Sequence, residues 1–111
     1  MVSYTFLLAI IWLHVLSDFF LQTDKMAVNK SKSIKWLSIH IAVYSSVFLI
    51  FGWEYALVNG ALHFATDFVT SRITSYFWKK EQRHWFFVTI GVDQAIHMTS
   101  LVLTYPLVKS L

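Results

Sequence analysis

Long apolar stretches alternate with short polar segments along the whole chain. The polar segments cover residues 23–35 and 78–84, and a tight turn at Gly52 and Glu54 separates two further stretches. Each stretch has about the 20 residues that a helix needs to cross a bilayer. The pattern predicts an all-α membrane protein, a four-transmembrane-helix bundle, with spans at residues 3–22, 36–53, 55–77 and 85–108.

Composition supports this class. A soluble domain of 111 residues normally covers its surface with charged side chains, but only 14% of these residues are charged and 57% are hydrophobic. Three glycines and one proline leave few of the turns that a barrel of short strands needs. We expect one domain over residues 1–111. The absence of cysteine excludes disulfides and thiolate metal sites.

The basic residues predict an orientation. Seven of the nine lysines and arginines lie in segments 23–35 and 78–84, and the turn between the second and third spans has none. By the positive-inside rule, both basic segments face the cytoplasm and both termini face the opposite side.

Each predicted span carries polar side chains where a lipid-embedded segment should have none. Most are four residues apart, so they share one helix face. An aspartate at a helix centre costs roughly 2.5–3.5 kcal/mol on insertion. Such residues persist when they face one another, a water-filled cavity or a metal. Seven ionisable groups lie in the half nearest the basic segments: His14, Asp18, His40, His63, Asp67, Asp93 and His97.

A weak internal repeat relates two of the spans. The segment His-x3-Asp-Phe begins at His14 and recurs at His63, in spans that should run in the same direction. A duplicated helical hairpin would leave this pattern.

The polar residues also follow a recognisable order: His-x3-Asp-Phe-x-Leu-Gln, His-x3-Tyr, Asn-x3-His-x3-Asp-x4-Arg and Asp-Gln-x2-His. This order resembles a family of small bacterial and phage integral membrane proteins catalogued as a domain of unknown function. The resemblance implies a multi-pass protein of the bacterial inner membrane, but it implies no activity. The matching residues are His14, Asp18, Phe19, Leu21, Gln22, His40, Tyr44, Asn59, His63, Asp67, Arg72, Asp93, Gln94 and His97.

Four histidines and three aspartates form a ligand set for one or two divalent ions. Imidazole and carboxylate suit zinc, manganese or iron, and helical bundles build such sites from facing helices. We therefore predict that the seven ionisable groups bind metal. Neighbouring polar groups would orient these ligands: Gln22, Tyr44, Asn59 and Gln94.

A metal near the cytoplasmic interface makes hydroxide available near neutral pH. Arg72 and Lys25 are predicted to bind a phosphate, and Lys30 and Arg83 border the same surface. The leading hypothesis is a metal-dependent hydrolase of a lipid or another membrane-associated substrate, with no catalytic residue assigned. We expect membrane lipid as a partner and no nucleic acid, and an oligomer or a partner protein stays open.

Three other classes stay open. A small transporter or channel for metal ions or protons would use the same residues as a relay. A haem-binding bundle would use His40 with His97 or His63, and a non-enzymatic membrane subunit would use them to hold helices together. A transport path needs polar residues that reach both faces. The outer half of every span is almost wholly apolar, which favours a one-sided site.

The orientation can be tested with reporter fusions placed after Lys32 and at Leu111. Because the first position follows basic residues and the second follows the fourth span, the two reporters should lie on opposite sides of the membrane. Signals from the same side would contradict the four-span topology.

Overall fold

The computed structural model describes residues 3–109, and all regular structure within this range is helical. The all-α prediction is therefore confirmed for these residues. In chain order, the elements are α1 (Tyr4–Val15), a π-helical turn η1 (Leu16–Phe20), α2 (Asp24–Asn29), α3 (Ile34–Val47), a 3-10 turn η2 (Phe48–Phe51), α4 (Trp53–Lys79) and α5 (Arg83–Lys109).

The four predicted spans correspond to α1 with η1, α3 with η2, α4 and α5, and their ends differ by one or two residues. The short helix α2 lies in a segment that the sequence pattern left as a polar loop. Thr23 caps α2, because its Oγ1 accepts a hydrogen bond from the N–H of Met26 at 3.2 Å. Met26 is the buried residue of α2.

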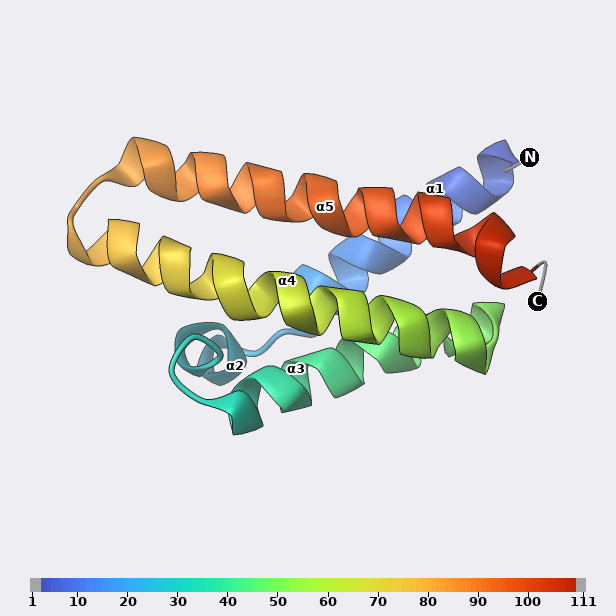
Figure 1. The fold of residues 1–111 in the computed structure, drawn as a ribbon, viewed down its shortest axis with the longest axis horizontal. Helices are drawn as coiled ribbons and strands as arrows, with labels where there is room; N and C mark the ends of the chain where they lie inside the picture. The colour runs from blue at the N-terminus through green and yellow to red at the C-terminus, as the bar shows by residue number, and fades with distance from the viewer. Residues whose placement is uncertain (1–2, 110–111) are drawn as a thin grey trace.

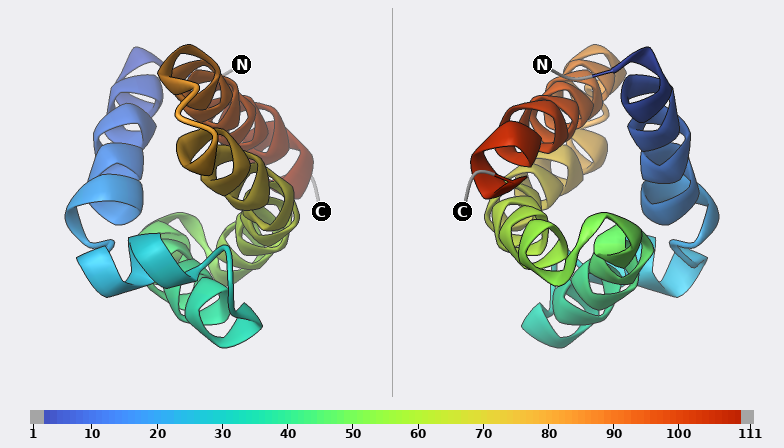
Figure 2. Two further views of the ribbon diagram at one scale, coloured as in Figure 1. Left: turned by 90° about the vertical axis from the view of Figure 1, so that its left-hand side faces the viewer. Right: turned by 90° about the vertical axis from the view of Figure 1, so that its right-hand side faces the viewer.

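The long helices run lengthwise and the chain reverses direction between them (Figure 1). The outer ends of α1 and α5 lie at the same end of the molecule as the turn between α3 and α4. Helix α2 and the turn between α4 and α5 lie toward the other end. Figure 2, which looks along the long axis, shows α1, α5, α4 and α3 arranged around a common interior. The two basic segments therefore lie toward the same end of the fold.

Two glycines make the antiparallel pairing of α3 and α4 close. Gly52 forms the turn with a φ of +118°, a conformation that side chains rarely adopt. At Gly60, a β-carbon would lie only 2.2 Å from Ser45 Oγ, so the absence of a side chain lets the two helices approach.

The buried interior is divided along its length. Near the termini, an apolar core contains Phe6, Ile10, Tyr44, Phe48, Tyr55, Ala56 and Leu101. The Tyr55 hydroxyl donates a 2.5 Å hydrogen bond to the Leu101 carbonyl oxygen there. The other half of the interior holds the buried histidines and aspartates. One half thus packs by apolar contact and the other by polar groups.

The outer surface is apolar. Trp12 is 71% exposed and Leu57 is 64% exposed, whereas more polar than apolar side chains are buried. Within residues 3–109, two helical segments are long and apolar enough to cross a membrane, Ile34–Phe51 and Arg83–Val108. Tyr4–Phe20 is apolar but shorter. The four-span arrangement thus has support from length and composition in two of its spans.

The close contact of α3 and α4 predicts opposite effects at two helical glycines. Gly60→Ala adds a methyl group against Ser45, whereas a β-carbon at Gly91 meets nothing within 4 Å. Both changes raise helix propensity equally, so their difference isolates packing. We expect Gly60→Ala to be less stable than Gly91→Ala by about 1–3 kcal/mol in detergent unfolding. Adding Ser45→Ala should restore most of this loss, and equal stabilities would contradict the close packing.

Candidate metal centre

The structure brings the seven predicted ionisable side chains into one buried region. All four long helical segments contribute: His14 and Asp18 come from α1 and η1, His40 from α3, the next two from α4, and the last two from α5. Each is at most 8% exposed: His14, Asp18, His40, His63, Asp67, Asp93 and His97. Sites in helical bundles are built in this way, from side chains on facing helices.

The π-helical turn η1 positions the first aspartate. The N–H of Leu21 donates to the carbonyl oxygen of Leu16 at 2.8 Å, which closes one turn of five residues. Asp18 lies inside this wide turn and is 3% exposed, and its neighbour Ser17 is fully buried. The Ser17 hydroxyl donates to backbone carbonyl oxygens of the preceding turn, which leaves the Asp18 carboxylate free to face the interior. Such turns often occur at functional sites.

Four ligand atoms converge in the first group, which consists of Asp18, His40, His63 and Asp67. His40 Nε2 lies 3.0 Å from Asp18 Oδ1, 3.3 Å from Asp67 Oδ2 and 3.2 Å from His63 Nε2. His63 Nε2 lies 3.4 Å from Asp18 Oδ1 and 3.2 Å from Asp67 Oδ2. Ligands bound tetrahedrally to zinc at 2.0–2.2 Å stand roughly 3.3–3.6 Å apart. The four atoms nearly have this spacing, so the group could hold a metal ion.

Several of these atoms lie close together without forming hydrogen bonds. Among residues 3–109, Asp18 Oδ1 has no hydrogen-bond partner, although two histidine nitrogens lie within 3.4 Å of it. His97 Nε2 likewise has none, although Asp93 Oδ1 is 3.0 Å away. The atoms are directed at shared space more than at one another, as the ligands of an ion are. Nδ1 of His40 and of His63 also lack a partner, so no acceptor within the described chain orients these rings.

A second group shares a residue with the first. It consists of Asp18, Asp93 and His97, and His97 Nε2 also lies 3.4 Å from Asp67 Oδ1. The rings of His63 and His97 stack with centroids 3.7 Å apart. Thr70 fixes the orientation of Asp93 by donating a 2.6 Å hydrogen bond to its Oδ1. Because Asp18 belongs to both groups, the arrangement has the shared carboxylate of a two-ion site.

Gln94 links the two groups from outside. Its amide nitrogen donates to Asp18 Oδ2 at 3.0 Å and to Asp93 Oδ2 at 3.1 Å. Its amide oxygen lies 2.5 Å from His14 Nε2, which therefore carries the proton. His14 Nδ1 then accepts from the Tyr44 hydroxyl at 3.1 Å. Both ring nitrogens of His14 are occupied, so the structure places this predicted ligand behind the ligand groups, beside Gln94 and Tyr44.

Two other predicted orienting residues lie elsewhere. Asn59 faces the apolar half, where its amide donates to the Tyr55 carbonyl oxygen at 3.1 Å and to Thr104 Oγ1 at 2.9 Å. It therefore contacts neighbouring helices instead of the ligand groups. Gln22 lines the cavity described next, and its buried Oε1 has no hydrogen-bond partner within residues 3–109.

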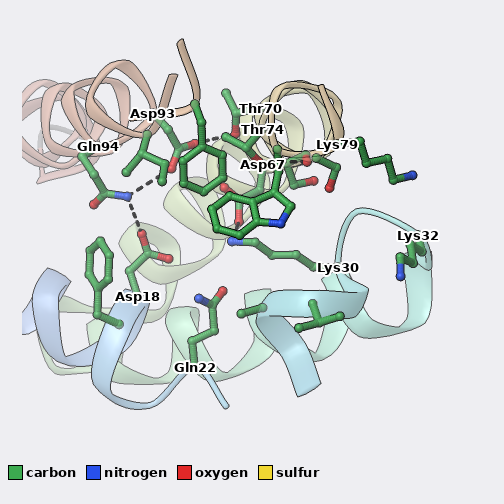
Figure 3. A pocket seen from close by; sticks show the side chains of 18 residues that line it. Asp18, Gln22, Lys30, Lys32, Asp67, Thr70, Thr74, Lys79, Asp93 and Gln94 are labelled. Atoms are coloured by element: carbon green, nitrogen blue, oxygen red, sulfur yellow. Dashed lines mark hydrogen bonds and ion pairs between the residues drawn. The ribbon is translucent and has the colours of Figure 1, made fainter. Parts of the chain in front are cut away.

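A cavity of about 470 Å³ leads to the carboxylates from the end of the molecule that carries α2 (Figure 3). Asp18, Asp67 and Asp93 line its inner part. Lys30 follows α2 and reaches into the cavity, where its Nζ lies 3.0 Å from Asp67 Oδ2. Lys32 and Lys79 lie at the outer edge. The cavity thus joins a carboxylate floor to a basic rim.

The predicted phosphate-binding residues do not line this cavity. Lys25 is exposed, and its Nζ lies 5.7 Å from the ring of Trp36. The guanidinium of Arg72 folds onto the ring of Phe68 and donates to the Phe68 carbonyl oxygen. Lys30 takes the place that the sequence assigned to Lys25. The basic charge of segment 23–35 was the available signal, but its role in membrane orientation obscured the one lysine that turns inward.

The fold and the site define an all-helical protein with a buried cluster of histidines and aspartates that could hold metal. The chain belongs to the family described as protein of unknown function DUF3307, whose model matches residues 6–111. This finding confirms the resemblance inferred from the sequence at the level of the family. Comparison with curated proteins and with solved structures gave no match.

The position of Gln94 predicts a stability effect. Gln94→Glu keeps the size of the side chain, but it removes both amide donors and adds a carboxylate beside Asp18 and Asp93. Hydrogen bonds to charged groups contribute about 1.5–3 kcal/mol each, so we expect a loss of at least about 2 kcal/mol in chelator-treated protein. The exposed Gln82→Glu is the control. Equal melting temperatures would show that Gln94 does not hold the carboxylates.

Proposed function

We propose that this chain is a multi-pass membrane protein that binds one or two divalent metal ions and uses them to hydrolyse a membrane-associated substrate. The observation that carries the proposal is the convergence of Asp18 Oδ1, His40 Nε2, His63 Nε2 and Asp67 Oδ2, with five separations of 3.0–3.4 Å. These atoms come from three helical segments far apart in the sequence. Hydrogen bonding alone does not account for their arrangement, because Asp18 Oδ1 has no partner in residues 3–109.

The distribution of polarity supports a membrane location with four spans. The molecule is 44 Å long, which exceeds the hydrocarbon core of about 30 Å. Apolar side chains cover its outside and charged groups fill half of its inside, the reverse of a soluble domain. Helix α4 carries the most polar residues of the proposed spans, and its Asn59, His63 and Asp67 are buried within the bundle. Such inward polarity is expected where lipid surrounds a bundle.

The donor set supports a hard or borderline divalent ion. Two aspartates and two neutral histidines balance the charge of one such ion exactly where the charge is buried. Nitrogen and oxygen donors without thiolate suit zinc, manganese or iron. Asp93 and His97, with the shared Asp18, provide for a second ion.

Access to the site supports hydrolysis over transport. The cavity opens toward the end that bears α2, so substrate and water reach the carboxylates from one side. A divalent ion, when bound, makes hydroxide available near neutral pH. The opposite half of the interior is filled by Phe6, Phe48 and Tyr55. A relay across the bundle would need polar groups through that half.

Metal content of the protein purified in detergent tests this proposal. We expect about one or two divalent ions per chain and a lower melting temperature after chelation. An ion held at about 100 times its Kd contributes about 2.7 kcal/mol to folding. His63→Ala and Asp67→Asn should each lose the metal and the effect of chelation. His84→Ala, on the exposed start of α5, and His14→Asn, behind the groups, should keep both.

The same preparations test hydrolysis. Vesicles of mixed phospholipids serve as the probe, and the release of phosphate or fatty acid is measured. Activity should follow the metal content of each variant and return when metal is added back to chelated protein. Metal-free protein that neither zinc nor manganese stabilises would contradict the metal site. Metal binding without lipid hydrolysis would remove the enzymatic part of the proposal and favour a structural role.

A further inference from the structure

The cavity above the carboxylates contains more than access to the proposed metal. Besides Asp18, Asp67 and Asp93 it has a basic side chain, unpaired polar groups and apolar walls. We propose that it binds a phosphate monoester carried by a membrane amphiphile, with Lys30 and Ser71 holding the phosphate. This inference rests on the metal site proposed above and names the substrate class of that site.

The charge of the cavity favours an anion only when metal is bound. Without an ion, its three lining carboxylates are balanced by the ammonium groups of Lys30, Lys32 and Lys79. One divalent ion changes this balance to +2. A phosphate monoester carries about −1.5 to −2 at neutral pH, so its charge matches that of the loaded cavity. A neutral or zwitterionic headgroup would leave the excess charge uncompensated.

Lys30 is the lysine placed to contact the phosphate. Its side chain is 16% exposed and its Nζ lies 3.0 Å from Asp67 Oδ2, one of the proposed ligand atoms. A metal on that oxygen attracts the same lone pairs as the ammonium group. Lys30 can then turn to an anion that touches both the metal and the cavity. Lys32 and Lys79 are exposed, so solvent screens their attraction.

Ser71 provides an independent sign of a ligand. It lines the cavity, is 6% exposed, and its Oγ has no hydrogen-bond partner within residues 3–109. A buried hydroxyl without a partner costs free energy, and a phosphate oxygen in the cavity would satisfy it. Gln22 Oε1 is unpaired in the same wall. Since that oxygen is an acceptor, it suits a protonated phosphate oxygen or a substrate hydroxyl.

The remaining walls suit an apolar chain. Phe19, Val28, Trp78, Phe86 and Ile90 line the cavity beside the polar groups. Phe19 and Trp78 are half-exposed, so the apolar wall continues onto the outer surface of the bundle. An amphiphile could therefore place its phosphate inside while its chain stays in the bilayer. Free phosphate would use the polar part alone.

Trp78 can report binding directly, because it lines the cavity. Its fluorescence is measured in zinc-loaded protein in which the other four tryptophans are replaced by phenylalanine, in neutral phosphatidylcholine vesicles. Phosphatidic acid and phosphatidylcholine, each with brominated chains, are the quenching probes. We expect phosphatidic acid to quench at about tenfold lower mole fraction, with the preference lost on chelation. The thermal shift of the chain with all its tryptophans, with the same two lipids, gives a second measurement.

Two substitutions assign the preference to the cavity. Lys30→Gln should reduce it about tenfold and Ser71→Ala about threefold, as expected for a charged and a neutral hydrogen bond. Lys25→Gln removes the same charge from exposed α2 and should change it less than about twofold. Equal losses from Lys30→Gln and Lys25→Gln would overturn the proposal.

Inorganic phosphate distinguishes the two sources of the group. If the ligand is an amphiphile, inorganic phosphate should displace brominated phosphatidic acid only weakly. Full displacement, with equal quenching by both lipids, would identify free phosphate as the ligand and overturn the amphiphile. Metal content is measured on the same samples. Metal-loaded protein without any Lys30-dependent binding overturns this inference alone, whereas protein that binds no metal overturns the proposed function and this inference together.

Discussion

The fold depends on the contact between two buried carboxylates and two imidazoles, those of Asp18, Asp67, His40 and His63. Two negative charges in an apolar bundle are costly unless cations or hydrogen-bond donors surround them. Each available partner lies on a different helix, so the helices must pack together before the charges are compensated. Other features of the interior, from the wide turn at Asp18 to the bridging amide of Gln94, bring donors to these oxygens.

This requirement explains why the interior has two unlike halves. The aromatic half gives the bundle its packing, since rings such as those of Phe6 and Tyr55 fill space without needing partners. The polar half has a cavity and unpaired atoms, so it contributes less to packing. Stable packing at one end thus holds the helices while the other end keeps room for ligands. The division follows the sequence, in which the ionisable residues lie toward the basic segments.

The four long helices could be predicted because their apolar lengths and four-residue polar spacings are properties of single segments. Helix α2 has only six residues and one buried side chain, so it leaves no periodic pattern. Membership of the site depends on contacts between segments. His14 shares a helix face with Asp18, yet Gln94 on another helix occupies its ring nitrogen. Lys30 meets Asp67 across 37 positions, a contact that charge alone did not indicate.

The wide turn η1 has a consequence for chain length. It accommodates an extra residue between α1 and the start of α2, and every residue after it is placed by that count. Phe20 is 80% exposed and lies outside both ligand groups. Deleting it would restore an ordinary helical turn, and the following chain would rotate by about 100° and shift by about 1.5 Å. Lys30 would lose its reach to Asp67 although no residue of the cluster had changed, so a side chain on the outer surface acts as a spacer for the interior.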